Sequence, residues 1–156
     1  MELLAPLAET PLARALITSA TLYLLVNAAH ILGTGMLFGA ILALDLRLLG
    51  FAPAVPLPPI APYLSRLAGA GVVLAIVTGF CLFTVRPTEY ARNPAFLAKL
   101  GLVALGLINV AVVHFGRGWR VVLAGGNPAT ALRISAMFSI IVWIAAVIAG
   151  RWIGFL

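Results

Sequence analysis

Residues 27–50 read NAAHILGTGMLFGAILALDLRLLG, and this stretch decides the fold. It is long and apolar enough to span a bilayer, which takes about 20 residues of helix. Its polar residues share one helical stripe, because positions three, four or seven apart lie on one face. The stripe comprises Asn27, His30, Thr34 and Asp45, with Gly33 beside it. Since a polar side chain in hydrocarbon must face the bundle interior and find a partner, the stripe predicts a functional site.

The composition of the whole chain also indicates a membrane protein. Of the 156 residues, 63% are hydrophobic and 9% are charged, whereas soluble domains have about 25% charged residues. The formal net charge of +6 comes from basic residues at the ends of apolar runs, where they meet lipid headgroups. The sequence has no phosphate-binding glycine loop and no Cys-x-x-Cys pair. Nucleotide hydrolysis, iron–sulfur chemistry and nucleic-acid binding are therefore not indicated.

Four apolar runs predict four membrane-spanning helices, at residues 20–44, 67–85, 95–115 and 129–150. The first 19 residues mix Leu and Ala with Glu, Arg and Pro, which predicts a short interfacial helix before the first span. Residues 51–62 contain five prolines and predict a loop. Asn93 followed by Pro94 predicts the capped start of the third span.

The predicted fold is all-α, a transmembrane four-helix up-down-up-down bundle preceded by the interfacial helix. Residues 1–156 then form a single integral membrane domain with both termini on one side of the lipid bilayer. Lysines and arginines divide evenly between the two sides, so the positive-inside rule does not orient the bundle.

Four blocks of the chain resemble a known but uncharacterised family. They are HILG at 30–33, DLRLLG at 45–50, NPAF at 93–96 with Lys99, and GRWIGF at 150–155. In combination they resemble a family of small bacterial membrane proteins catalogued as a domain of unknown function. The resemblance implies a multi-pass protein of the bacterial inner (plasma) membrane and brings no activity with it. A histidine followed by small residues in an early span is also similar to small haem-binding membrane proteins, the HemJ-type protoporphyrinogen oxidases.

His30 is the main candidate for chemistry. As an axial ligand of a b-type haem, it would need small neighbours such as Gly33 so that the macrocycle can lie against the helix, with Asn27 and Thr34 on the same stripe. Alternatively, it is a neutral histidine hydrogen-bonded across the bundle, a proton relay or a ligand of another metal. Lys99 and Arg151 could hold haem propionates or bind lipid phosphates.

His114, near the end of the third span, is a candidate second ligand of the same iron. The first helix is longer than the third, so the relative depth of the two histidines depends on which side the excess overhangs. If it overhangs beyond Asp45, His30 and His114 are level and can share an iron. If it overhangs on the terminal side, they cannot, and His114 is an interfacial residue without a special role.

Asp45 is the only acidic residue at its end of the predicted bundle. It cannot pair with Arg47, because positions two apart on a helix do not face each other. We expect a structural ion pair with an arginine of another helix, or a role in proton or ligand access. The candidate partners are Arg66, Arg117, Arg120 and Arg133.

Two functional hypotheses follow. The first is a haem b-binding redox protein that exchanges electrons with a quinone or another membrane redox partner. The second is a non-haem module, such as a small carrier, channel subunit or assembly partner, whose polar stripe serves packing or an ion path. Gly35 and Gly39 form a small-xxx-small pair that could serve either the bundle or a homo-oligomer. Whether the protein is an enzyme stays open.

Overall fold

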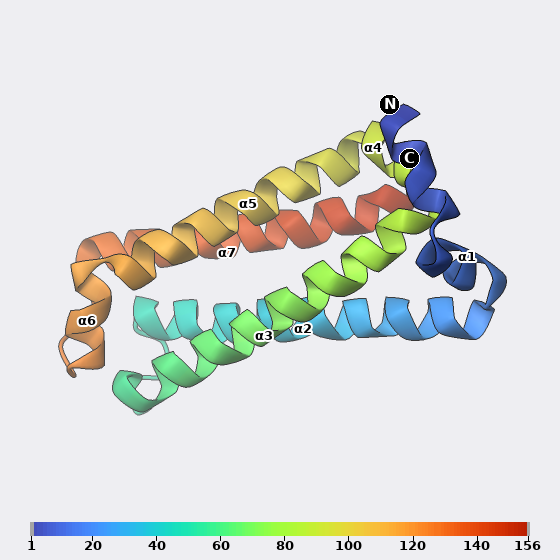
Figure 1. Cartoon of the computed structure of the whole chain (residues 1–156). Coiled ribbons are helices and arrows are strands. Elements are labelled where there is room, and N and C mark those ends of the chain that lie inside the picture. Colours follow the sequence, from blue (N-terminus) through green and yellow to red (C-terminus); the bar gives the residue numbers. More distant parts are fainter. Residues whose placement is uncertain (1, 156) are drawn as a thin grey trace.

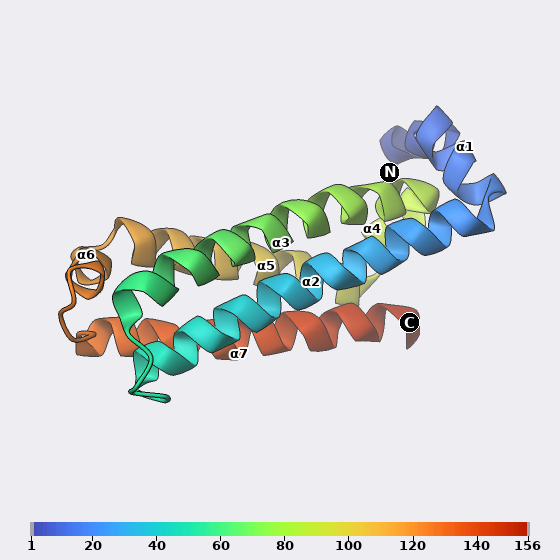
Figure 2. The ribbon, with the colours of Figure 1, turned by 90° about the horizontal axis from the view of Figure 1, so that it is seen from below.

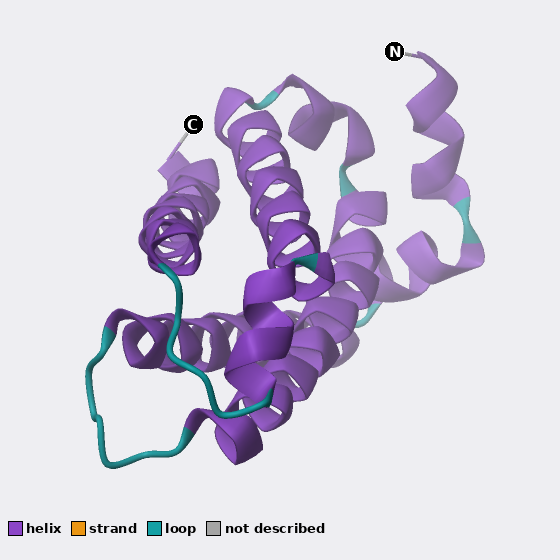
Figure 3. Ribbon diagram, turned by 90° about the vertical axis from the view of Figure 1, so that its left-hand side faces the viewer, coloured by secondary structure: helices purple, strands orange, loops and turns teal. Residues whose placement is uncertain are grey.

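The computed structural model describes residues 2–155, and over these residues the chain is helical and contains no strand (Figure 3). The four long helices are α2 (Ala20–Leu49), α3 (Leu57–Val85), α5 (Pro94–Phe115) and α7 (Thr130–Trp152). Each is long and apolar enough to cross a membrane. The predicted all-α four-helix bundle is therefore confirmed.

The long helices run alternately in opposite directions, and both chain ends lie at the same end of the bundle (Figures 1 and 2). We call this end the terminal end. The opposite end, which holds the α2–α3 connection and the short helix α6 (Arg117–Leu123), is called the turn end.

Two short helices precede the first span, where one was expected: η1 (Glu2–Glu9) and α1 (Pro11–Thr18). The Thr10 hydroxyl caps α1 by accepting a hydrogen bond of 3.3 Å from the Ala13 backbone N–H. The Ser19 hydroxyl caps α2 in the same way. Helix α1 buries Ala13 and Leu16 and packs against α2 and α3. The N-terminal segment thus covers the terminal end of this helix pair.

Helix α3 begins at Leu57, earlier than the predicted start at residue 67. Pro58 and Pro59 lie in its first turn, where a backbone N–H has no intrahelical acceptor, so the two prolines lose no hydrogen bond there. Only Pro62 lies inside the helix. The loop between α2 and α3 is therefore shorter than the predicted loop of residues 51–62, because the prolines from Pro58 onward belong to α3.

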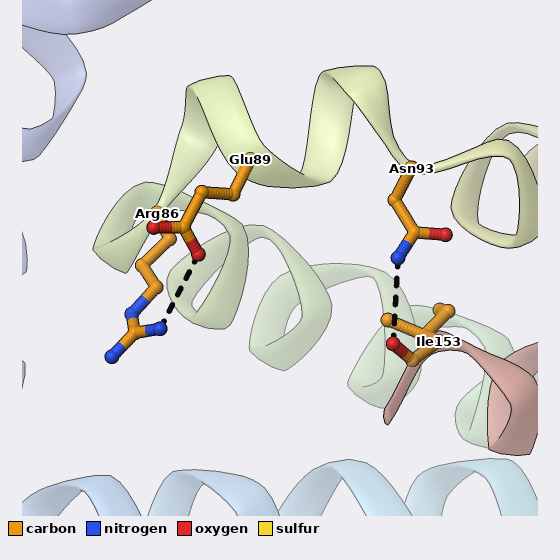
Figure 4. A network of polar contacts seen from close by, with 4 residues as sticks. All are labelled: Arg86, Glu89, Asn93 and Ile153. Carbon is orange, nitrogen blue, oxygen red and sulfur yellow. Dashed lines mark hydrogen bonds and ion pairs between the residues drawn. The ribbon is translucent and has the colours of Figure 1, made fainter. Parts of the chain in front are cut away.

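The short helix α4 (Pro87–Arg92) leads into α5, and Asn93 caps α5 as predicted. The Asn93 side-chain oxygen accepts hydrogen bonds from the backbone N–H groups of Ala95 and Phe96, at 2.9 and 3.2 Å. Its amide nitrogen donates to the carbonyl of Ile153, in the final short helix η2 (Ile153–Phe155), at 3.4 Å (Figure 4). Asn93 therefore ties the start of α5 to the end of the chain.

An aromatic cluster surrounds α4 at the terminal end. Phe83 stacks on Phe96 with ring centroids 5.6 Å apart, and Tyr90 packs against both rings. Burial, with a smaller effect of nearby Tyr23, raises the pKa of the Tyr90 hydroxyl above its usual range. An exposed ion pair between Arg86 and Glu89 at 3.3 Å (Figure 4) adds little stability, as is usual for surface pairs.

The bundle consists of two helix pairs. Helix α2 packs along α3, and α5 packs along α7, while the α2–α7 contact joins the pairs. Gly33 and Gly71 lie at the α2–α3 contact, where a Cβ on Gly71 would be 2.5 Å from the Leu37 nitrogen and 2.8 Å from the Gly33 oxygen. Two backbones can approach this closely only where the residues lack side chains.

Gly35 and Gly39 do not belong to this packing. A Cβ added to either would meet no atom within 4 Å. The small-xxx-small pair therefore faces away from the bundle, and of its two predicted roles only the homo-oligomer contact stays a prediction.

Candidate functional site

The interior holds polar groups in two regions. One surrounds His30 between α2 and α3; we call it the His30 site and define it by His30, Ala75, Thr78 and Gly79. The other lies toward the turn end, is lined by residues of α2, α3, α5 and α7, and includes Asp45. We call it the Asp45 cavity.

The imidazole of His30 is held by α3. Its Nδ1 lies 3.0 Å from the Ala75 carbonyl oxygen and 3.1 Å from the Thr78 hydroxyl oxygen. A carbonyl oxygen can only accept, so Nδ1 carries the proton and Nε2 carries the lone pair. The Thr78 hydroxyl donates in turn to the Leu74 carbonyl at 2.6 Å. Within residues 2–155, the hydrogen bonds of the ring are made by Nδ1.

Gly79 makes room for this ring. A Cβ on Gly79 would lie 3.0 Å from Cε1 of His30 and 3.4 Å from Nδ1. The glycine predicted to flank the histidine has another role: a Cβ on Gly33 would lie 2.9 Å from the Ala75 nitrogen. Gly33 therefore packs against the α3 backbone and does not offer the free surface for a macrocycle that was predicted for it, so a haem on Nε2 of His30 would not lie against Gly33.

The other predicted members of the stripe do not gather around the imidazole. The Thr34 hydroxyl donates to the His30 carbonyl one turn earlier, at 2.8 Å, so it is used within its own helix. Asn27 is exposed on α2. Both positions share the helical stripe with His30, but neither side chain forms a hydrogen bond with the ring among the described residues.

The side chain of Lys99 lies against Gly150 of α7, where a Cβ would be 3.4 Å from Cδ and Cε of Lys99. Arg151 is exposed, with its guanidinium carbon 4.8 Å from the centroid of the Phe155 ring. The predicted role of Lys99 and Arg151 in holding an anion stays a prediction.

His114 is separated from His30 along α3. Its Nε2 lies 3.1 Å from the Ser65 hydroxyl, whereas His30 contacts Ala75 and Thr78. Ten to thirteen residues of helix lie between these contact points, roughly 15–20 Å at a rise of 1.5 Å per residue. Nδ1 of His114 also bonds the Val110 carbonyl, at 2.9 Å, so both ring nitrogens are occupied. The two histidines are therefore too far apart to ligate one iron, and the predicted role of His114 as the second ligand is wrong.

The Asp45 cavity has a volume of about 160 Å³. Six of its lining residues are polar: Asp45, Ser65, Asn109, His114, Ser135 and Ser139. Apolar residues such as Leu37, Leu48 and Val113 make up most of the remaining wall. Protein interiors contain few voids this large. The cavity therefore distinguishes the half of the bundle toward the turn end, here called the Asp45 half, from the tightly packed half around the His30 site, the His30 half.

Most polar groups of the wall are paired across helices. The Ser135 hydroxyl donates to the Asn109 side-chain oxygen at 2.6 Å, and the Asn109 amide donates to the Ser135 carbonyl at 3.3 Å. His114 is paired with Ser65. Ser139 of α7 lines the same wall as the Asp45 carboxyl.

Two buried polar atoms of the wall have no hydrogen-bond partner among the described residues: Oδ2 of Asp45 and Nε1 of Trp143. The two residues are 7% and 3% exposed, and both line the cavity. An unpaired buried polar atom costs about 1–3 kcal/mol, so each such atom in a folded protein needs an explanation.

The predicted ion pair of Asp45 is not formed. Among the side chains that the structure describes, those of residues 4–155, no lysine or arginine nitrogen lies within 4.0 Å of the Asp45 carboxyl oxygens. The expected partners have exposed side chains at the protein surface, whereas Asp45 is buried: Arg66, Arg117, Arg120 and Arg133. The prediction counted charges at one end of the bundle, but the carboxyl faces the interior.

Sequence reasoning missed Ser65, Asn109, Ser135, Ser139 and Trp143. A signal was present in α7, because Ser135, Ser139 and Trp143 are spaced four residues apart and therefore share one face. Among the described residues, no group of three or more His, Cys, Asp or Glu side chains could hold a metal ion.

Four apolar spans enclosing these two polar regions define a multi-pass integral membrane protein. The chain belongs to a family of unknown function, DUF6644, which it matches over residues 15–156. No curated protein and no solved structure matches the chain. The expected membership of an uncharacterised family is confirmed in this general form.

Proposed function

We propose that the protein binds a b-type haem through His30 and serves electron transfer or another redox reaction in the bacterial inner membrane. The observation that carries this proposal is the way His30 is held. Metal-ligating histidines commonly donate one ring N–H to a backbone carbonyl, which fixes the tautomer and orients the ligating nitrogen. The Nδ1 contact with the Ala75 carbonyl at 3.0 Å has this form and leaves the lone pair on Nε2.

We propose one histidine ligand, because both ring nitrogens of His114 are hydrogen-bonded and its contact with Ser65 lies at least ten residues along α3 from the contacts of His30. Lys99 would supply a positive charge for a haem propionate. Haem iron, when bound, supplies one-electron chemistry tuned by its axial ligand and surroundings. A quinone or a membrane redox partner would then exchange the electron.

The test is the absorption spectrum of protein purified from a haem-replete host. We expect a Soret band and a reduced α-band in the wild type, and their loss in His30→Ala. His114→Ala is the matched control, since it also removes a half-buried histidine with two ring hydrogen bonds but should keep the spectrum. A colourless wild type, or a His30→Ala variant that keeps its haem, would show the proposal to be wrong.

The alternative function is a non-haem module, such as a small carrier or channel subunit with an ion path. It is favoured by a different observation, the buried carboxyl in the Asp45 cavity. Ionisable residues inside a membrane domain commonly mark ion or proton pathways.

A further inference from the structure

The Asp45 cavity presents a specific combination of groups. Oδ2 of Asp45 and the Nε1–H donor of Trp143 are both buried and unpaired. Lone pairs on Ser65, Ser135 and Ser139 add further acceptors in the same wall. An occupant must therefore accept a hydrogen bond from the indole N–H and interact with a carboxyl oxygen.

Water meets both requirements, because it donates and accepts. A cavity needs about 10–15 Å³ to admit one water, and buried waters take two to four polar partners. The volume of about 160 Å³ has room for several. Dry cavities of this size are lined by apolar side chains alone, and this wall carries six polar residues.

The charges around Asp45 decide what else can bind there. Besides Asp45 itself on α2, the titratable lining residue is His114 of α5, and α3 and α7 contribute hydroxyl and indole groups but no ionisable side chain to the wall. The basic residues of the turn end lie outside the lining. Arg47, on α2 itself, donates to the Val55 carbonyl at 2.6 Å, and the other four are exposed: Arg66, Arg117, Arg120 and Arg133. A carboxylate in this cavity has no protein counter-charge, so its neutralising partner must be a small cation.

We propose that the Asp45 cavity is a hydrated proton-binding site, in which Asp45 takes up and releases a proton through water from the turn end. In the release step the O–H bond of the Asp45 carboxyl breaks and a cavity water takes the proton as hydronium; uptake is the reverse. The turn end is close, because Asp45 lies four residues before Leu49 at the end of α2, about 6 Å along the helix axis. The site is distinct from the His30 site and does not depend on haem.

Asp45 is the only aspartate in the chain, so aspartate labelled with ¹³C at its side-chain carboxyl reports on this residue alone. We would record infrared difference spectra of the labelled wild-type protein in lipid vesicles, over a range of bulk pH and after transfer to D₂O. We expect a label-sensitive carboxylic C=O band that changes reversibly with pH and shifts in D₂O without unfolding. Asp45→Asn should lack the band. A band that neither responds to pH nor exchanges would mean a sealed, dry cavity and would overturn the proposal.

Two further arms make the test specific. At fixed pH, replacing choline chloride by sodium or ammonium chloride should leave the band unchanged; a response would identify a metal or ammonium cation as the occupant and overturn the proton assignment. Trp143→Phe removes the unpaired indole donor and should shift the band, whereas Trp152→Phe, at an exposed tryptophan outside the cavity, should not. Identical spectra for the two variants would contradict a water network shared by Asp45 and Trp143. None of these readouts depends on whether haem binds.

Discussion

At the His30 site, α2 and α3 approach so closely that glycines form the contact, and the histidine is satisfied by a backbone carbonyl of the facing helix. At the Asp45 cavity, the four long helices surround an open volume, and a carboxyl oxygen and an indole N–H remain unpaired. Both regions place an ionisable group of α2 in a membrane interior, where unsatisfied polarity is costly. At the His30 site the closely packed helix supplies the hydrogen-bond partner itself. In the Asp45 cavity a bound occupant must supply it.

Because of this difference, we expect substitutions in the two regions to affect stability in different ways. The His30 half should respond to added volume at the helix contact, because there is no space to absorb it. The Asp45 half should tolerate added volume and respond to changes in polarity.

Gly71→Ala should destabilise the protein strongly, because the new Cβ would lie 2.5–2.9 Å from backbone atoms of Gly33 and Leu37. Backbone cannot give way as a side-chain end can, so the cost should be at or above the ~1–3 kcal/mol usual for overpacking. Gly69→Ala is the control on the same helix, since its Cβ meets no atom within 4 Å. It should be neutral or gain up to about 1 kcal/mol of helix propensity. Thermal unfolding in detergent measures both; equal melting temperatures would mean that α2 and α3 are not in close contact.

Gly106→Ala should cost less, about 1–2 kcal/mol. Its Cβ would lie 2.7 Å from Cζ2 of Trp143, but the indole borders the cavity and has space to shift. Gly101→Ala, again without a neighbour within 4 Å, is the control on α5. A loss as large as that of Gly71→Ala would show that the cavity does not relieve the strain.

Much of the fold could be predicted from the sequence, because hydropathy and helix punctuation are local signals. The cap at Asn93 and the start of α2 at residue 20 agree with the predicted positions. The start of α3 differed, since first-turn prolines and interior prolines look alike in composition. The extent of the site was harder to predict, because it depends on which helix faces meet.

The histidines and the aspartate illustrate that limit. Spacing placed His30 and Asp45 on one stripe of α2. The contacts of His30 with Ala75, Thr78 and Gly79 depend on the register of α3 against α2, which no local sequence pattern determines. Counting charges favoured an arginine partner for Asp45, whereas the helix rotation turns the residue into the buried cavity. Register and rotation are decided by packing across the bundle, so long-range partners could not be predicted.

Asp45→Leu should raise stability by about 1 kcal/mol, because it removes a buried carboxyl with an unpaired oxygen and fills part of an open volume. Ser139 can redirect its hydroxyl to the carbonyl one turn earlier in α7. Asp45→Asn is the matched control: it keeps a polar group of the same shape and should change stability by less than about 1 kcal/mol. A clear loss in Asp45→Leu would mean that the carboxyl stabilises the fold through contacts with the protein.

The smallest effect should be the coupling between Asp45 and the turn-end arginines. The double-mutant cycle of Asp45→Asn with Arg133→Gln measures it, because the cycle cancels the separate effects of the two substitutions. If the two residues formed a desolvated ion pair, removing one partner would lower the free energy of unfolding by about 3–5 kcal/mol. The second substitution would then restore part of that loss. Here the carboxyl is buried, the guanidinium is exposed, and no ion pair joins them among residues 2–155. We therefore expect a coupling energy within about 0.5 kcal/mol of zero, the range found for residues without shared partners.

Arg66 and Arg117 should give the same result. A coupling above about 1 kcal/mol with any of the three would show that α2 turns its carboxyl outward in the membrane, and the distinction between a packed half and a hydrated half would fail at its turn end.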